Sequence, residues 1–215
     1  MSVLLLVRHG QASFGAADYD ALSDLGHEQA RILGAALKAR GVRPDRIVRG
    51  RMRRHDETAA GILDGLGGGP EPTIDEGWNE FDFLKVLAVH PIAPEPDLDH
   101  AGFQRFFEDA TGRWISGGYD HEYDESFGQF TGRVDEALDR AAVASGVTVV
   151  VTSGGPIGVV ASRLTAGDAS LWQRFNRVAV NSAVTKVITG RSGATLSTFN
   201  EHSHLEHDRA LLSYR

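Results

Sequence analysis

The chain has 215 residues, 41% of them hydrophobic and 24% charged, which is the composition of an ordinary globular protein of one domain, with or without an insertion. It contains no cysteine, which excludes disulfides, thiol catalysis and cysteine-ligated metals. The formal net charge is −7, and the N-terminal apolar run of about six residues is too short for a membrane span and lacks the basic start of a signal peptide, so we expect a cytoplasmic enzyme or binding protein.

That first apolar run, residues 3–7, consists of valine and leucine and stops abruptly at Arg8, His9 and Gly10. So short a run followed by polar and glycine residues predicts a buried strand. The strand would deliver Arg8 and His9 to the edge of an α/β sheet where ligands bind, and Gly10 would let a ligand approach the backbone. A histidine after a strand is also common as a hydrogen-bonded turn residue, so position alone leaves catalysis open.

The next elements read as a helix, a strand and a second helix. Ser23 is a candidate N-cap for a helix that Gly41 ends, and residues 46–49 form a short strand. Residues 49–60 open a helix that breaks at the glycine run 65–69. Six arginines lie between Arg43 and Arg54, but without a domain-wide basic excess or interleaved aromatics most of them indicate a solvated face, not a nucleic-acid site. One or two at the junction of strand and helix could instead point to the same edge as Arg8 and His9.

Acidic residues dominate the middle of the chain. Residues 75–83 hold four carboxylates beside a tryptophan and two phenylalanines, which would raise a carboxyl pKa if buried or would simply face water if not. Residues 82–126 carry ten acidic and three basic residues, whereas the rest of the chain is neutral. This shift predicts an acidic lid insertion at about 82–126 within a single domain spanning 1–215. Its short helix, about 103–114, has aromatic residues that we expect to fix the segment to the body.

The second half of the chain returns to a strand and helix pattern. A helix at about 125–144 precedes residues 147–152, a strand apolar enough to be central and buried on both faces. Ser153 and Gly154 open the turn to a helix at 157–164, a junction suited to holding an anion at helix N-terminal amides. A helix near 169–177 and two strands, 183–189 and 194–199, follow. The whole pattern predicts an α/β fold with a mostly parallel central sheet flanked by helices, an antiparallel edge hairpin and the inserted lid.

With these motifs in order, the sequence resembles the histidine phosphatase superfamily, which includes the phosphoglycerate mutases. Arg8-His9-Gly10 is similar to the family signature, and Leu22 to Gly26 with Gln29-Ala30 is similar to the start of its first helix. Arg54 with Thr58-Ala59 resembles the segment of its second arginine, and Glu80 is placed like its acid. The resemblance covers nearly the whole chain.

The resemblance implies a function and a set of site residues. His9 would be the nucleophile of a metal-independent phosphomonoesterase that hydrolyses a small phosphorylated metabolite through a phosphohistidine, and Glu80 would be the acid and base. The residues implied for substrate binding are Arg8, Gly10, Gln11, Arg54, Ser153 and Gly154. Charge repulsion from Arg8 and Arg54 would keep His9 neutral, and their guanidinium groups would replace a metal, so no cofactor is expected.

Two departures from the family pattern leave alternatives open. Ser153 stands where the family usually carries a second histidine, and Gly50 where a serine is common. A weakened binding or regulatory protein that keeps the phosphate pocket is therefore the alternative function, and a mutase is less favoured than a phosphatase. A third hypothesis is a metal-dependent hydrolase built on His202, His204 and His207. We expect a small phosphorylated substrate or inorganic phosphate as partner, with no nucleic acid and no membrane, and the sequence does not indicate an oligomeric state.

Overall fold

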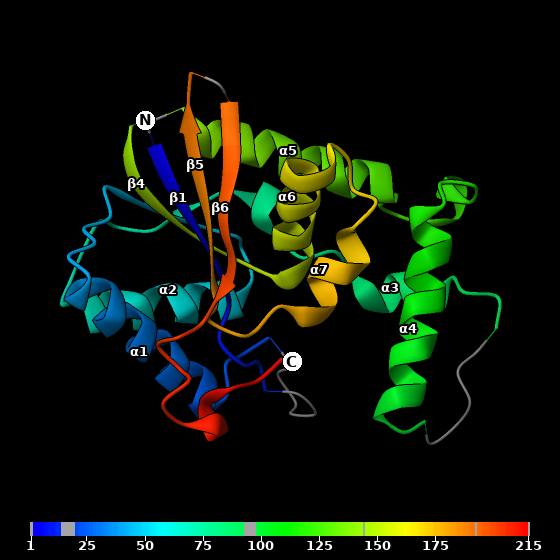
Figure 1. Cartoon of the computed structure of the whole chain (residues 1–215). Coiled ribbons are helices and arrows are strands. Elements are labelled where there is room, and N and C mark those ends of the chain that lie inside the picture. Colours follow the sequence, from blue (N-terminus) through cyan, green and yellow to red (C-terminus); the bar gives the residue numbers. More distant parts are fainter. Residues whose placement is uncertain (1, 14–19, 93–97, 144, 192, 215) are drawn as a thin grey trace. The chain divides into compact units, whose positions relative to one another are not determined.

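The computed structural model describes residues 2–13, 20–92, 98–143, 145–191 and 193–214, in which six strands form one sheet (Figure 1). The order across the sheet is β3-β2-β4-β1-β5-β6. The strands are β1 (Ser2–Arg8), β2 (Arg46–Arg49), β3 (Thr73–Ile74), β4 (Gly146–Thr152), β5 (Val184–Gly190) and β6 (Gly193–Glu201). Strands β3, β2, β4 and β1 pair in parallel, and β5 runs antiparallel to both β1 and β6. The predicted α/β fold with an antiparallel edge hairpin is confirmed; the two-residue strand β3 was not predicted.

The two most apolar strands lie side by side in the middle of the sheet. Leu5 of β1 is in register with Val149 of β4, and Val7 with Val151, and all four side chains are buried. Residues that point to either face of the sheet are apolar, because each of these strands is covered on both faces. The prediction that residues 147–152 form the central strand is confirmed, since β4 lies between β2 and β1.

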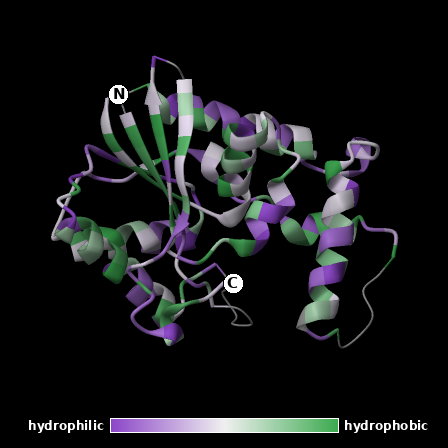
Figure 2. Cartoon of the chain, in the orientation of Figure 1, coloured by the Kyte–Doolittle hydropathy of each residue, from purple (hydrophilic) through white to green (hydrophobic). Residues whose placement is uncertain are grey.

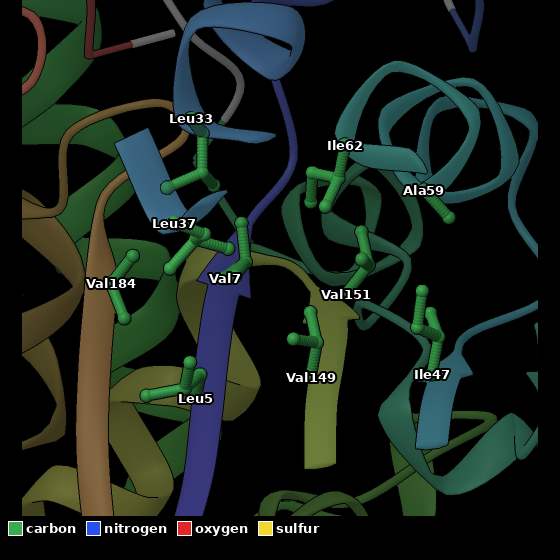
Figure 3. Packing of buried hydrophobic residues seen from close by; sticks show 10 residues of the cluster. All are labelled: Leu5, Val7, Leu33, Leu37, Ile47, Ala59, Ile62, Val149, Val151 and Val184. Carbon is green, nitrogen blue, oxygen red and sulfur yellow. The ribbon is translucent and has the colours of Figure 1, made fainter. Parts of the chain in front are cut away.

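Helices α1 (Asp24–Ala39) and α2 (Arg53–Leu66) cover one face of the sheet (Figure 3). Ser23 caps α1 as predicted, its hydroxyl accepting from the Gly26 amide at 3.1 Å. The helices approach closely because Gly34 has no side chain: a Cβ there would lie 2.2 Å from the Ile62 carbonyl oxygen. The buried side chains between this face and the helices are Leu5, Val7, Leu33, Leu37, Ile47, Ala59, Ile62, Val149, Val151 and Val184.

Helix α6 (Gly154–Ala166) follows β4 and packs on the opposite face, where Figure 1 shows it across the sheet from α1 and α2. Its residues from Gly154 to Ser162 are all buried. Helix α7 (Trp172–Val178) packs against α6. The chain thus leaves β1 toward one face and β4 toward the other. Connections that diverge from neighbouring parallel strands open a crevice at their carboxyl ends, which is where ligands bind in such sheets.

Residues Phe81–Arg133 form a separate compact unit, and the remaining residues form the unit that contains the sheet. The second unit holds α3 (Phe83–Ala88), the short 3-10 helix Asp120–Glu122, α4 (His100–Ile115) and the start of α5 (Phe127–Ala142). Trp114 is fully buried among Phe81, Phe127 and Phe130, with ring centroids 4.8 to 5.5 Å away. Trp114 therefore builds the core of its own unit, which the sequence analysis did not foresee.

The unit begins one residue before the predicted insertion and ends seven residues after it, and its role as a lid stays a prediction. Figure 2 shows hydrophilic residues along much of α4, while the central strands are largely apolar. None of the helices in the described part of the chain is long and apolar enough to cross a membrane.

Candidate active site

His9 lies directly after β1, at the carboxyl end of the sheet. Its amide donates to the Thr152 carbonyl oxygen at 2.8 Å, so it continues the pairing with β4, and its side chain is buried. The ring Nδ1 lies 2.7 Å from the Gly10 carbonyl oxygen. A carbonyl oxygen only accepts, so the geometry assigns the proton of the neutral ring to Nδ1 and leaves the lone pair on Nε2.

The surroundings of His9 favour that neutral form. Burial lowers the pKa of His9 well below its usual 6.5, and the positive charges of Arg54 and Arg8 and the ring of His55 lower it further. The imidazole is therefore unprotonated at neutral pH, with a nucleophilic nitrogen available. The expectation that the two arginines repel a proton from His9 agrees with this arrangement.

The backbone of the turn after His9 packs against three other segments. The Gly10 amide donates to Thr58 Oγ1 at 3.0 Å, and Asn181 Nδ2 donates to the His9 carbonyl oxygen at 3.0 Å. A Cβ on Gly10 would lie 2.4 Å from the Gly26 carbonyl oxygen. Glycine at this position thus has a packing reason in the contact with α1, in addition to the ligand approach that we expected.

The two arginines are anchored differently. Arg8 Nη1 donates to the carbonyl oxygens of Ala179 and Tyr214, the second at 2.9 Å. Arg54, on the first turn of α2, is nearly buried and its Nη1 donates to Asp20 Oδ1 at 2.8 Å. A buried guanidinium paired with a carboxylate on one edge is held in a fixed orientation. Both predicted arginines are thus gathered near His9.

Glu80 lies just beyond the 3-10 helix Glu76–Trp78, at the first turn of α6. Its Oε2 accepts from the Gly155 amide at 3.0 Å, and a Cβ on Gly155 would lie 2.0 Å from Oε1, so glycine makes room for the acid. Thr152 Oγ1 donates to the Trp78 carbonyl oxygen at 2.6 Å and fixes this segment to the end of β4. A helix-terminal amide thus helps to orient Glu80, and the effect of the aromatic neighbours on this carboxyl group stays a prediction.

Gln11 and Gly154 complete the predicted set. Gln11 Oε1 accepts from the Ser23 hydroxyl at 2.9 Å, which turns its side chain toward the cap of α1. Gly154 is buried, and a Cβ there would lie 2.7 Å from Asn176 Oδ1. Their roles in substrate binding stay predictions.

His55 is a candidate site residue that the sequence analysis missed. It is fully buried on α2, its Nε2 lies 2.8 Å from Ser153 Oγ, and its ring centroid is 5.8 Å from that of His9. Burial, followed by the charges of Arg54 and Arg49, lowers the pKa of His55 well below 6.5. The sequence does place a histidine next to Arg54, and Gly50 and Ser153 depart from the family pattern. Nothing in the sequence showed that these three residues meet.

The histidine-based metal hypothesis is wrong for the described residues, among which no group of three or more His, Asp or Glu could hold a metal ion. Strand β6 ends at Glu201, so His204 and His207 lie in turns and not on one face of a strand. His204 is largely buried, and that burial lowers its pKa to about 4.

Arginines along the β2–α2 connection are paired with carboxylates. Arg49 contacts Asp56 at 2.8 Å, and Arg53 contacts Glu57 at 2.6 Å. These pairs neutralise much of the positive charge on the face that the sequence analysis expected to be solvated.

Comparisons with known proteins identify the family. A model of the histidine phosphatase superfamily (branch 1) matches residues 4–202. A 2,3-bisphosphoglycerate-dependent phosphoglycerate mutase of Methylobacterium sp. (strain 4-46) is 40% identical over 89 residues, which cover 38% of this chain and 42% of the mutase. The match therefore spans about two fifths of that relative's length.

Solved structures share the fold along nearly the whole chain. A phosphoglycerate mutase from Bacillus anthracis str. Sterne has a TM-score of 0.66 at 19% identity and covers 94% of each chain. A phosphoserine phosphatase from Entamoeba histolytica in complex with 3-phosphoglyceric acid has a TM-score of 0.64 at 20% identity, covering 95% of this chain and 100% of that one. The mycobacterial glucosyl-3-phosphoglycerate phosphatase has a TM-score of 0.64 at 20% identity, covering 94% and 99%. The family match over residues 4–202, with His9 and two arginines at the carboxyl end of the sheet, shows that this chain belongs to the histidine phosphatase superfamily.

Proposed function

We propose that the protein is a phosphomonoesterase that hydrolyses a small phosphorylated metabolite through a phosphohistidine on His9. The observation that carries the proposal is the 2.7 Å contact between His9 Nδ1 and the Gly10 carbonyl oxygen, because it leaves the lone pair on Nε2. The low pKa of His9, caused first by burial and then by Arg54 and Arg8, supports the same role. Similar folds include a phosphoserine phosphatase and a glucosyl-3-phosphoglycerate phosphatase, which favours a small phosphorylated substrate.

The reaction has two steps. In the first, the Nε2 lone pair of His9 forms a bond to phosphorus while the bond from phosphorus to the ester oxygen breaks, and Glu80 in its protonated form donates the proton that the leaving alcohol needs. In the second, Glu80 takes a proton from water, the water oxygen bonds to phosphorus, and the phosphorus–nitrogen bond breaks to release inorganic phosphate. Arg8 and Arg54 supply positive charge to the phosphoryl oxygens in both transition states.

The test is hydrolysis of an aryl phosphate in the presence of a chelator, with wild type and His9→Ala compared. We expect chelator-resistant hydrolysis by wild type and a phosphoenzyme that is labile to acid, and neither in His9→Ala. Hydrolysis that survives His9→Ala, or that stops with the chelator, would refute the proposal. Adding a phosphoglycerate acceptor separates a hydrolase from a mutase: transfer to the acceptor in preference to water would make the protein a mutase.

Ser153 favours a second candidate, a phosphate-binding protein with little turnover. A hydroxyl carries no positive charge, and losing one charge-assisted donor at a transition state costs on the order of 10²–10³ in rate. Tight binding of inorganic phosphate without hydrolysis of any aryl phosphate would favour this candidate over the first.

A further inference from the structure

We propose that His55 is a positioning residue that holds the Ser153 hydroxyl toward the phosphoryl group bound beside His9, an inference that rests on the proposed function. Ser153 is placed by the sheet: Arg8 is in register with Thr152, and the His9 amide donates to the Thr152 carbonyl oxygen at 2.8 Å. The residue after each register partner therefore lies at the same edge, and Ser153 is next to His9.

The hydroxyl of Ser153 is not occupied by helix capping. Ser153 is the N-cap residue of α6, but its side chain makes no hydrogen bond to the first amides of that helix. Instead its Oγ lies 2.8 Å from His55 Nε2, and both side chains are fully buried. A serine at an N-cap position usually accepts a hydrogen bond from the first helical amides. Because the Ser153 hydroxyl is instead bonded to a buried side chain of α2, we infer that it has a role other than capping.

The surroundings of His55 decide the direction of this hydrogen bond. Burial and the charges of Arg54 and Arg49 lower the pKa of His55 well below 6.5, so the ring is neutral and has one N–H. Among the described residues, Nδ1 has no hydrogen-bond partner. A buried N–H without an acceptor is costlier than a buried lone pair without a donor. The proton is therefore on Nε2 and is donated to Ser153 Oγ.

This direction leaves the Ser153 proton for another acceptor. Because Oγ already accepts from His55, its own O–H points away from that ring, and a phosphoryl oxygen held against His9 is an acceptor at this edge of the sheet. The ring centroids of His9 and His55 are 5.8 Å apart, so the pair and the nucleophile share one site. His55 thus acts through Ser153 and does not need to touch the substrate.

Gly50 makes the arrangement possible. A Cβ at this position would lie 2.3 Å from His55 Nδ1 and 2.8 Å from Asn79 Oδ1. Any side chain there would move the imidazole and its hydrogen bond to Ser153. The hydrogen bond between His55 and Ser153 therefore depends on the missing side chain of Gly50.

The test is a double-mutant cycle with His55→Leu, Ser153→Ala and the double variant, read as the single-turnover rate of His9 phosphorylation by an aryl phosphate. We expect Ser153→Ala to slow this rate by roughly 10²-fold, the usual loss for one transition-state donor. His55→Leu should slow it by about 10-fold in the wild-type background and by less than about 2-fold when Ser153 is alanine, since contacting residues are not additive. His55→Gln keeps an N–H at the same reach and should restore the rate to within about 3-fold.

Controls separate this role from damage to the fold. His207→Leu changes an exposed histidine of the tail and should leave the rate unchanged, and near-ultraviolet circular dichroism should show the same native signal for all variants. An equal effect of His55→Leu in both backgrounds, or no rescue by glutamine, would overturn the positioning role. An acid-stable phosphoenzyme that disappears in Ser153→Ala would make Ser153 the nucleophile and overturn it as well.

Failure of the proposed function is distinguishable from failure of this inference. If neither the wild type nor any variant forms a phosphoenzyme, the phosphohistidine proposal fails. The double-mutant cycle is then repeated with the dissociation constant of inorganic phosphate as the measured quantity. A coupled loss of phosphate affinity, with rescue by His55→Gln, would still support the positioning of Ser153. Additive losses of affinity would overturn it.

Discussion

Strands β1 and β4 end side by side, but an imidazole is placed at each strand end in a different way. β1 brings its own histidine: His9 follows the strand directly and is fixed by the carbonyl oxygen of the next residue, Gly10. β4 is followed by Ser153, whose hydroxyl is hydrogen-bonded to the imidazole of His55 on α2, 98 positions away in the sequence. The first arrangement depends on local backbone geometry, whereas the second depends on the packing of α2 against the sheet.

The largest expected effect lies at the β1 end. His9→Ala removes the nucleophile and should lower the rate of aryl phosphate hydrolysis by at least about 10⁴-fold, because removing a covalent catalyst leaves only binding and electrostatic contributions. Phosphate affinity should change far less, because Arg8 and Arg54 remain. Measurements of kcat and of the phosphate dissociation constant for wild type and variant check this. A variant that keeps a tenth of the wild-type rate would contradict it.

The next effect concerns Arg54, the buried arginine on the first turn of α2. Arg54→Lys keeps a positive charge but loses the planar fork, so we expect kcat to fall by about 10²-fold, within the range for one lost transition-state donor. Arg53→Lys is the matched control, since Arg53 pairs with Glu57 at 2.6 Å on the exposed side of the same helix. Steady-state kinetics of both variants decide the question: equal losses would mean that the guanidinium of Arg54 has no special role.

Gly50→Ala should act chiefly through His55, the partner of Ser153 after β4. The new Cβ would meet His55 Nδ1 at 2.3 Å, and overpacking of this kind costs about 1–3 kcal/mol of unfolding free energy. His55→Ala in the same chain empties that space and should recover part of the loss. Urea unfolding of the single and double variants measures it, and a Gly50→Ala protein as stable as wild type would show that the ring is not confined there.

The smallest expected effect is a pH dependence of stability. His9 and His55 are neutral in the folded state because burial holds each pKa well below 6.5, but in the unfolded chain they take up protons near pH 6.5. Below that pH the unfolded state binds more protons, so stability is complete above 6.5 and decreases as the pH falls. At about pH 5.5 each histidine lowers the unfolding free energy by at most about 1.4 kcal/mol.

Urea midpoints at about pH 7.5 and about pH 5.5 check this dependence. His55→Gln should show a smaller drop between the two pH values than wild type, because one titrating group is removed. The other histidines with a lowered pKa, the buried His9 and the partly buried His204, are unchanged in the variant and contribute equally to both proteins. An identical drop in wild type and variant would contradict the assignment of a neutral, buried His55.

The sequence alone determined what depends on local pattern. The apolar run before Arg8 predicted β1, the valine-rich run predicted β4, and Ser23 predicted the cap of α1, because continuous apolar runs and capping residues are patterns of neighbouring residues. The motif around His9, taken with the segments at 22–30 and 54–59 and with Glu80, predicted the family, and the family match over residues 4–202 confirms it. Local residues also implied that arginines would lie near His9.

Only the tertiary structure decided which side chains meet at the carboxyl end of β4. His55 and Ser153 meet because α2 packs over β4, and Gly50 and Gly155 are glycines because His55 and Glu80 occupy the space of their missing side chains. Trp114 turned out to be the core of its own compact unit for a similar reason. Contacts between residues far apart in the chain depend on packing in three dimensions, and a single sequence carries no local signal for them.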